Sequence, residues 1–339
     1  MATPRERFLA EMRGEGDGVV YSNIRIGNPV WKEHTEKFDW MPEYSPYVGV
    51  GLGKEPGMVA DTEVTDVWGC HWRYPLQSLD GICIGHPVAD LADLDQWEPP
   101  KAEEFTDWDK AAENLQKTKD DGGVAVGGTD HGFMFLRMTY LRGFENFMLD
   151  VADPTPESVE LIRLVEEYWA DVVRRWIEVG VDQISIGDDL GLQHALPVSP
   201  EAWRHVLKPS FERIMSQCKD AGVEIHLHTD GYIVDIIPDL IECGVTTLNP
   251  QDLVNGFDNL EELALGKTFI ELDIDRQDIT VFGSPDEVDA HIKRCITTFG
   301  SKNGGLSMVW GVYPPTPYDN VEAAIKAMVE YATYWTNGG

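Results

Sequence analysis

The sequence predicts a single α/β domain folded as a (β/α)8 TIM barrel, with polar residues gathered at the carboxyl ends of the barrel strands. From residue 122 onward, apolar strand-like segments alternate with longer helical segments, which is typical of a parallel sheet. A doubly wound sheet would be expected to carry an early glycine-rich phosphate-binding turn, and the sequence has none. Barrels of this length are commonly one domain, so residues 1–339 are expected to form a single unit.

The boundaries of the expected elements follow from the apolar segments and from the residues that begin and end helices. A Thr-Pro start and Gly180 delimit one long helix, and Ser199 and Gly222 delimit another. The expected strands are 19–25, 123–128, 181–187, 223–228, 245–250, 268–274 and 305–310. The expected helices are 1–16, 101–121, 140–151, 154–179, 200–221, 233–242, 260–265, 285–299 and 321–335.

Residues 26–100 are rich in proline, glycine and aromatic side chains. The segment is too long for one connecting loop, so it is expected to hold hairpin structure and to form a subdomain that covers the carboxyl ends of the strands. Its tryptophans are Trp31, Trp40, Trp68, Trp72 and Trp97.

Composition excludes several classes of protein. The formal charge of −32 disfavours nucleic acid and anionic membrane surfaces as partners. No stretch approaches the ~18 apolar residues of a membrane span, and the charged start of the chain lacks an apolar signal core, so a cytoplasmic location is expected. The five cysteines are odd in number and form no CxxC pair, which favours reduced thiols over disulfides or a structural zinc knuckle.

Strand alternation places a set of polar residues on the inner face of the barrel. Apolar positions must face the helices, so the alternate positions face the interior or the mouth. The inward set is Gln183, Ser185, Gly187, Asp189, Glu224, His226, His228, Asp230, Phe269, Glu271, Asp273 and Asp275. Asn249 and Gln251 are added to it from the end of the expected strand 245–250. Ionisable groups are costly inside a barrel unless they are paired or solvated, and the carboxyl ends of barrel strands are where active sites form. The set therefore predicts an active site, with His228, Asp189 and Glu271 as candidate catalytic residues.

The two inward imidazoles and the carboxylates also suit a metal, because zinc binds histidine nitrogen and carboxylate oxygen. The alternative is that His226 and His228 hydrogen-bond carboxylates without any metal. In the covering segment, Trp68, Trp72 and Tyr74 accompany His71, and an aromatic floor of this kind suits a flat apolar ligand. The alternative is that these aromatic side chains, Trp72 above all, form the core of the small subdomain.

The chain resembles the uroporphyrinogen decarboxylase-like superfamily. The resemblance runs from TPRERFLAEMRGE near the start to PPTPYDNVEAAIKAMVEY near the end. Its most specific part is IHLHTDGYIVDIIPDLIECGVTTLNPQD at 225–252, supported by GVDQISIGDDLG and LDIDRQDITVFGSPDEV. The resemblance implies a (β/α)8 barrel. The superfamily comprises decarboxylases of uroporphyrinogen and methyltransferases that work with corrinoid proteins.

The sequence departs from both branches at the motifs that bind their ligands. The decarboxylases carry an arginine-rich RQAGRY-type segment for an eight-carboxylate substrate, whereas residues 23–28 here contain Arg25 alone. The other arginines considered, Arg137 and Arg142, lie in helix-like stretches. The methyltransferases place zinc on a His-x-Cys motif and a later cysteine. Here His228 matches, Asp230 replaces the cysteine, and 310–315 contains no cysteine.

A metal in this chain would accordingly need an oxygen-rich set, and we expect His228, Glu271 and Asp273 to converge within roughly 8 Å. The resemblance implies the methyltransferase component of a corrinoid-dependent demethylation system. It would move a methyl group from a small aryl methyl ether or methylamine to a corrinoid on a separate protein, with zinc as the candidate metal. The expected substrate-binding residues are Arg25, Trp68, His71, Asn249, Gln251 and Tyr313.

Two alternatives remain at this point. One is a cofactor-free decarboxylase of uroporphyrinogen or a smaller aromatic acid, in which Asp189 would hold a pyrrole N–H. The other is a non-catalytic binding protein, which would leave the ionisable cluster without a purpose.

Overall fold

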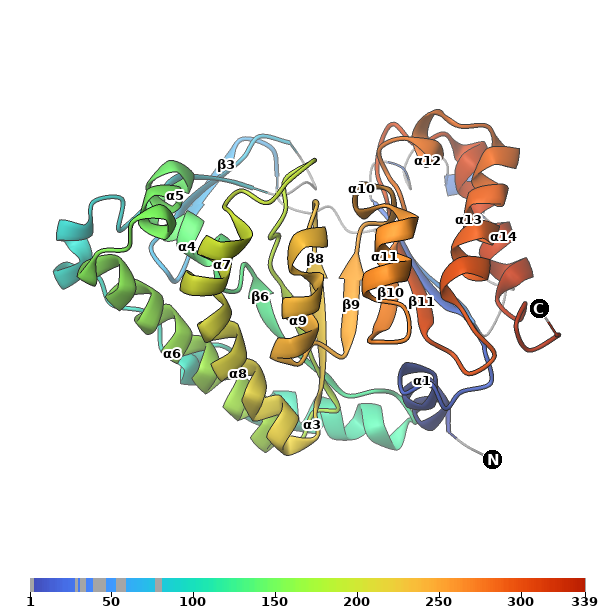
Figure 1. Cartoon of the computed structure of the whole chain (residues 1–339), viewed down its shortest axis with the longest axis horizontal. Coiled ribbons are helices and arrows are strands. Elements are labelled where there is room, and N and C mark those ends of the chain that lie inside the picture. The colour runs from blue at the N-terminus through green and yellow to red at the C-terminus, as the bar shows by residue number, and fades with distance from the viewer. Residues whose placement is uncertain are drawn as a thin grey trace.

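The computed structural model describes residues 3–27, 30, 35–38, 47–52, 59–76 and 81–338. Eight strands form one sheet in the order β2-β1-β11-β10-β9-β8-β7-β6, and every pairing in it is parallel (Figure 1). These strands are β1 (Tyr21–Ile26), β2 (Val48–Leu52), β6 (Val126–His131), β7 (Gln183–Gly187), β8 (Glu224–Thr229), β9 (Thr247–Pro250), β10 (Phe269–Asp273) and β11 (Leu306–Val312). The curled sheet with its helices outside is consistent with a TIM-like barrel. Among the described residues no ladder joins the two end strands, β2 and β6.

The eighth strand comes from an unexpected place. β2 lies within the segment that the sequence assigns to the cover, yet it pairs with β1 in the main sheet. Its sequence, VGVGL, carries two glycines, so it lacks the apolar run that marks the other strands. The boundary of 26–100 for the covering subdomain is therefore wrong at its start.

Helices pack on the outer face of the sheet (Figure 1). The α-helices are α1 (Pro4–Met12), α3 (Trp108–Asp120), α4 (Phe135–Arg142), α5 (Phe144–Ala152), α6 (Pro156–Val179), α7 (Pro200–Val206), α8 (Lys208–Ala221), α9 (Ile237–Cys243), α10 (Asp252–Asn255), α11 (Phe257–Leu263), α12 (Ile279–Phe282), α13 (Pro285–Phe299) and α14 (Tyr318–Tyr331). The 3-10 helices are η1 (Thr35–Phe38), η3 (Leu91–Gln96), η4 (Ala102–Glu104) and η5 (Val234–Ile236).

Local sequence explains most helix ends. α6 begins with a capping box of Thr155 and Ser158 and ends at Gly180, whose φ is 91°. The helix expected over 200–221 is instead two helices, α7 and α8. Pro209 cannot donate the backbone hydrogen bond that would continue α7, so the chain starts a new helix there.

A small antiparallel sheet forms within the segment that was expected to cover the strands. Its strands are β3 (Thr62–Thr65), β4 (His71–Tyr74) and β5 (Ile82–Gly85), in the order β3-β4-β5. Trp72 contacts Tyr140 of α4 edge-on at 4.7 Å between ring centroids, and the Cys70 thiol donates to the Tyr140 carbonyl at 3.4 Å. The sheet thus sits on α4, the helix that follows β6 (Figure 1). Trp31 and Trp40 lie outside the described residues.

α1 lies beneath the opposite, amino-terminal ends of the strands (Figure 1). Arg13 Nε donates to Glu224 at the start of β8 at 3.0 Å, and Arg5 Nε donates to Asp182 just before β7 at 2.8 Å. Phe8 meets Phe269, the first residue of β10, edge-on at 6.2 Å. These contacts tie the first helix to three strands and leave the carboxyl ends as the other opening.

Burial in β8 and in β1 follows the expected alternation. In β8, Ile225, Leu227 and Thr229 are buried, while the alternate residues keep partial exposure. In β1, Ile24 and Ile26 are buried under helices and Arg25 is exposed on the other face. The inner face of the curled sheet is therefore accessible from the mouth. No helix among the described residues is long and apolar enough to cross a membrane.

The burial of Glu11 on α1 can be tested through the pH dependence of stability. Its side chain is 1% exposed; Oε1 accepts the N–H groups of Asp17 and Val19, and Oε2 has no partner among the described residues. Burial raises its pKa from the ordinary 4.5 to about 7. The folded chain therefore holds this proton more tightly than the unfolded chain, and the stability so gained, present below pH 4.5, is lost as pH rises through about 7.

Glutamine at position 11 cannot titrate. We therefore expect the free energy of unfolding of Glu11→Gln to fall by on the order of 2 kcal/mol less than that of the wild type between pH 4.5 and 7.5, as measured by urea unfolding. The exposed Glu15→Gln variant is the control and should follow the wild-type pH profile. Identical pH profiles for Glu11→Gln and the wild type would contradict the burial of this carboxyl.

Candidate active site

The loops after β7 and β8 interlock at the mouth of the barrel. Gly231 has a φ of 84°, and a Cβ on it would lie 2.2 Å from the carbonyl oxygen of Gly191, so the approach requires glycine. The Gly191 N–H donates to the Asp230 carbonyl at 3.2 Å. The Asp230 N–H in turn donates to Asp189 Oδ1 at 3.0 Å. The interlock therefore fixes two carboxylates beside each other, from two different strands.

The neighbour of Asp189 has a different task. Asp188 is fully buried and accepts the backbone N–H groups of Met134, Phe135 and Leu136 at the start of α4. Burial raises its pKa to about 6, against the effect of those N–H groups. Asp188 thus positions α4, while Asp189 faces the mouth, as strand parity predicts.

His131, Asp189 and His228 bring three ligand atoms together at the mouth, all within 4.8 Å of one another. His131 Nε2 lies 3.5 Å from Asp189 Oδ2, and His228 Nε2 lies 3.9 Å from Asp189 Oδ1. Burial opposes ionisation of Asp189, but the hydrogen bond from His131 and the N–H of Asp230 outweigh it and hold the pKa below its ordinary value. Asp189 is therefore a carboxylate at neutral pH.

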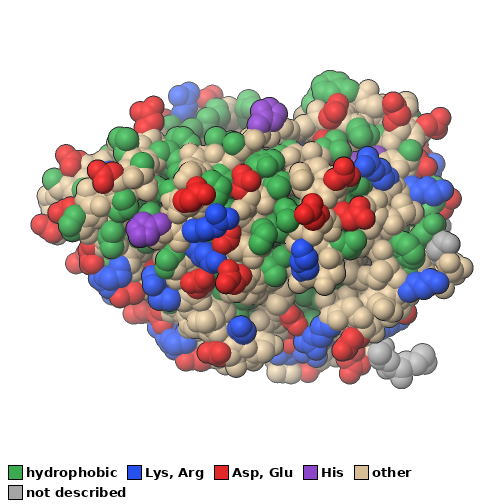
Figure 2. All heavy atoms as spheres, in the orientation of Figure 1, with side chains coloured by type: hydrophobic (Ala, Val, Ile, Leu, Met, Phe, Trp, Pro, Cys, Tyr) green, Lys and Arg blue, Asp and Glu red, His purple; other side chains and the backbone are tan. Residues whose placement is uncertain are grey.

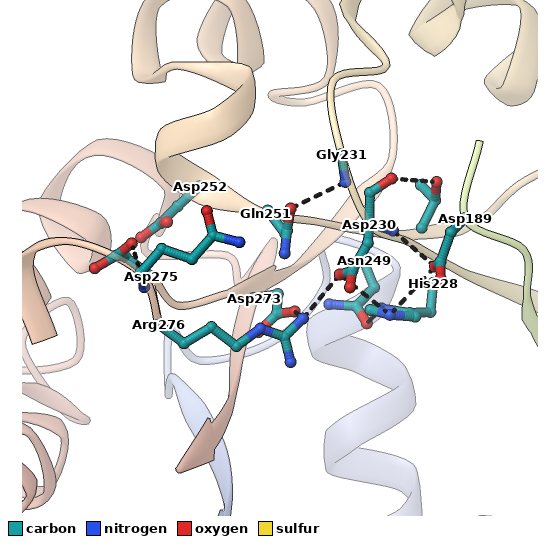
Figure 3. Close-up of polar contacts among 12 residues, drawn as sticks. Asp189, His228, Asp230, Gly231, Asn249, Gln251, Asp252, Asp273, Asp275 and Arg276 are labelled. Carbon is teal, nitrogen blue, oxygen red and sulfur yellow. Dashed lines mark hydrogen bonds and ion pairs between the residues drawn. The ribbon is translucent and has the colours of Figure 1, made fainter. Parts of the chain in front are cut away.

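A chain of hydrogen bonds orients His228 (Figure 3). Asn249 Nδ2 donates to the Glu271 carbonyl, so Asn249 Oδ1 must be the acceptor of the 2.7 Å contact with His228 Nδ1. The proton accordingly sits on Nδ1, and Nε2 points toward Asp189 and Asp230. In this state Nε2 can ligate a metal, or it can take a second proton and become an acid.

Arg276 occupies the other side of the mouth. Its Nη2 lies 2.8 Å from both Asp230 Oδ1 and Asp273 Oδ2 (Figure 3). Burial raises the pKa of Asp273 to about 7, and Arg276 offsets this only in part. His228 Nε2 is 3.5 Å from Asp230 Oδ1, so the guanidinium and the imidazole share one carboxylate.

Glu271, which was expected to converge with His228 and Asp273, has its carboxylate paired with His226. Glu271 Oε2 lies 2.8 Å from His226 Nε2, and Ser185 and Ser307 complete the network at 3.0 and 3.3 Å. Burial opposes ionisation of Glu271, but the His226 contact lowers its pKa nevertheless. Two residues along a strand lie on the same face but in different layers, so Glu271 pairs one layer below Asp273. Asp230 takes its place beside His228 and Asp273.

Two of the expected substrate-binding residues hold the site together. Asn249 is 3% exposed and orients His228. Gln251 is 8% exposed, and its Oε1 accepts the Gly231 N–H at 2.9 Å. Both amides are therefore engaged with the protein.

Arg25 and Tyr313 line the opening. Arg25 is exposed on the inner face of β1, where it is in register with Gly311 of β11. Tyr313 follows β11 and is 42% exposed. Both can meet a ligand that enters from the mouth.

Trp68 and His71, which were expected to bind the substrate, have protein partners in this structure. Trp68 is 2% exposed, stacks on Trp97 at 6.2 Å and meets Tyr168 edge-on at 4.6 Å. It is a core residue beneath the cover. His71 makes 3.1 Å contacts with Glu63 and Thr65 of its own small sheet.

His131 and Arg276 contribute to the site but do not stand out in the sequence. His131 ends β6 in the run Asp130-His131-Gly132, and Gly132 has a φ of 103°. The same order, a polar residue at a strand end followed by a glycine turn, occurs at Asp230-Gly231. This shared pattern could have identified His131 from the sequence. Arg276 comes three residues after Asp273 and carries no such mark.

Fold and site together define an α/β barrel protein with a histidine and carboxylate centre at the carboxyl ends of its strands. The family model of uroporphyrinogen decarboxylase (URO-D) matches residues 64–331, and the chain belongs to this family. Among solved structures, a methyltransferase from Methanosarcina mazei is similar in fold, with a TM-score of 0.63 and 18% identity over 98% of this chain and 99% of its own. The YdhT protein from Bacillus subtilis aligns over 99% and 94% of the two chains at 11% identity, with a TM-score of 0.47. No curated protein matches the sequence.

The donor atoms fit a zinc ion best at His131, Asp189 and His228. These supply two nitrogens and an oxygen, and the second nitrogen of His228 is hydrogen-bonded as in many metal sites. The second group, His228, Asp230 and Asp273, already holds the Arg276 guanidinium between its carboxylates. A metal there would have to displace this cation.

Zinc titration of the folded protein against a chromophoric chelator tests this assignment. We expect His228→Gln to weaken binding at least 100-fold, since it removes a ligand, and Asn249→Leu to weaken it about 10- to 100-fold, since it removes the orienting partner. His226→Gln is the matched control, on the same strand and face but one layer lower, and should bind as the wild type does. Equal affinity of His228→Gln and wild type would rule out His228 as a ligand.

Proposed function

We propose that this protein is the substrate-side methyltransferase of a corrinoid-dependent demethylation system, moving a methyl group from a small methyl ether or methylamine to the corrinoid of a separate protein. The observation that carries the proposal is the group of His131, Asp189 and His228, whose donor atoms meet at the mouth of the barrel. Family membership and the full-length likeness in fold to the Methanosarcina mazei methyltransferase support it.

The reaction needs an electrophilic partner for the leaving atom. When the methyl group departs, the ether oxygen or amine nitrogen keeps the bonding electron pair, and the barrier falls if that charge is neutralised. A zinc ion bound to the three residues would act as a Lewis acid on this atom. His228 carrying a proton on Nε2 would serve the same purpose as a general acid.

The remaining residues hold this centre in place. Asn249 keeps the Nδ1 proton of His228, so Nε2 is the nitrogen directed at the substrate. Gln251 and Gly231 fix the loop that carries Asp230. Arg25 and Tyr313 stand at the open side, where they would contact the body of the substrate.

The charge of the mouth favours a neutral or cationic substrate. Three carboxyl groups, those of Asp189, Asp230 and Asp273, gather at the mouth. Arg276 pairs with Asp230 and Asp273, and Arg25 is the other arginine placed at the opening. Acidic side chains also outnumber the basic ones interspersed with them on the face shown in Figure 2, which suits neither nucleic acid nor an anionic membrane as a partner. A cytoplasmic location accords with this surface.

Decarboxylation of uroporphyrinogen or a smaller aromatic acid is the second candidate, because the matching family carries that name and Asp189 is ionised at the mouth. Eight substrate carboxylates would need cationic partners. Arg142 is instead buried against Asp150 at 2.6 Å, and Arg137 is buried 3.4 Å from Asp66 with its guanidinium over the Trp68 ring. Neither is available to a ligand, and for this reason we rank the methyltransferase first.

Incubation with uroporphyrinogen III under anaerobic conditions, followed by chromatography of the oxidised products, separates the two candidates. We expect no coproporphyrin. In parallel, aryl methyl ethers and methylamines are supplied with a reduced corrinoid protein, and methylation of the corrinoid is followed by its absorption spectrum. Ready formation of coproporphyrin would reverse the ranking and make Asp189 the central residue.

Once an active substrate is known, variants of the proposed catalytic residues can be compared by their rates of methyl transfer. We expect His228→Gln and Asp189→Asn to lower the rate of methyl transfer by roughly 10²- to 10⁴-fold, because each removes a group acting on the leaving atom. His205→Gln alters an exposed histidine on α7 that is not among the residues of the centre, and should leave the rate unchanged. Full activity of His228→Gln would exclude the proposed centre.

A further inference from the structure

A second cluster of metal-ligating side chains lies outside the mouth, between α10 and α13. Asp252 is the first residue of α10, and His291 and Cys295 stand one turn apart on α13. His291 Nε2 is 2.7 Å from Asp252 Oδ2, and Cys295 Sγ is 3.8 Å from that nitrogen and 4.0 Å from that oxygen. Asp252 and Cys295 are fully buried and His291 is 5% exposed.

We propose that Asp252, His291 and Cys295 form a second, structural metal site for zinc or a similar divalent cation. The site shares no residue with the centre at the mouth and does not depend on the proposed function.

The distances are close to those of one face of a tetrahedral zinc site. With bonds of about 2.3 Å to sulfur and about 2.0 Å to nitrogen or oxygen, tetrahedral geometry separates sulfur from its neighbours by about 3.6 Å and nitrogen from oxygen by about 3.3 Å. The two sulfur distances, 3.8 and 4.0 Å, are within half an ångström of this. Only the Asp252–His291 pair, at 2.7 Å, must open to admit the ion.

The thiol is the observation that points to a ligand. Asp252 and His291 form a hydrogen bond with each other. Cys295 Sγ lies beside both bonded atoms, but at distances at which a thiol hydrogen bond is weak. With Nδ1 of His291 protonated, binding of a divalent cation would displace two protons, that of the thiol and the one between Asp252 and His291 Nε2. The cation then faces two anionic ligands and one neutral ligand, so no net charge is left in the buried site.

The site would secure the turn on which the mouth rests. α10 carries Asp252 between Gln251, which accepts the Gly231 N–H, and Asn255, whose Oδ1 accepts the Ile233 N–H. An ion bound to Asp252 would tether this turn to α13 and so hold the loop after β8 from behind.

The cluster is closed to solvent. The Phe257 ring meets His291 edge-on at 5.9 Å, and the Arg294 guanidinium covers the Phe257 ring at 4.0 Å. An ion must therefore enter while the chain folds, whereas zinc added to folded protein reports the mouth.

Cobalt(II) distinguishes the two sites, because only the buried one contains a thiolate. Full-length protein is produced in cobalt-supplemented minimal medium, and its near-ultraviolet spectrum is examined for a thiolate-to-cobalt charge-transfer band. We expect the band in the wild type and in His228→Gln, with about one cobalt per chain retained in the latter. Cys295→Ala should lose the band, and Cys218→Ala, which removes a buried thiol from α8, should keep it.

Zinc-edge X-ray absorption of the wild type is the check that needs no variant. It should show a zinc–sulfur distance of about 2.3 Å, with one sulfur for every two zinc ions if the mouth is also occupied. Absence of the charge-transfer band from cobalt-loaded wild type, or its persistence in Cys295→Ala, would overturn the proposal. A zinc shell of nitrogen and oxygen alone would do the same, while leaving the centre at the mouth intact.

Discussion

The backbone contact between Gly191 and Gly231 is the constraint on which the mouth of this barrel depends. Because no side chain fits at either position, the loops after β7 and β8 approach until Asp189 accepts the Asp230 N–H. Two carboxylates are thus brought together by the backbone, against their mutual repulsion. Three basic side chains reduce this repulsion, because each contacts Asp189, Asp230 or both: His131, His228 and Arg276.

The inner face of the sheet contains two polar layers with different degrees of satisfaction. In the lower layer, His226, Glu271, Ser185 and Ser307 bond to one another. In the upper layer, His228 has one nitrogen fixed by Asn249 and the other directed at carboxylates 3.5 Å or more away. Enclosed polar groups must find partners within the protein, whereas groups at the mouth can exchange partners with a ligand. The upper layer is therefore where chemistry is expected.

Hydrogen bonds to the helices and loops that follow the strands hold these layers in position. Asp188 holds the start of α4 through three backbone N–H groups, and α4 in turn carries Tyr140, on which the small covering sheet packs. On the other side, the α10 turn holds the loop after β8 through Gln251 and Asn255. Adjacent residues on one strand thus serve opposite purposes: Asp188 positions structure, and Asp189 faces the mouth.

The sequence by itself determined the order of the main-sheet strands other than β2, and the face on which their residues lie, since both follow from local periodicity and capping. Parity therefore placed Asp189, His228 and Asp273 on the inner face, where each contacts another ionisable side chain of the mouth. Only the tertiary structure decided that Glu271 pairs with His226, that Trp68 belongs to the core, and that His131 and Arg276 join the site. β2, with two glycines and no apolar run, was recognisable only once paired with β1. Parity is a property of one strand, but layer, partner and burial depend on register between strands and on loops whose path no local pattern encodes.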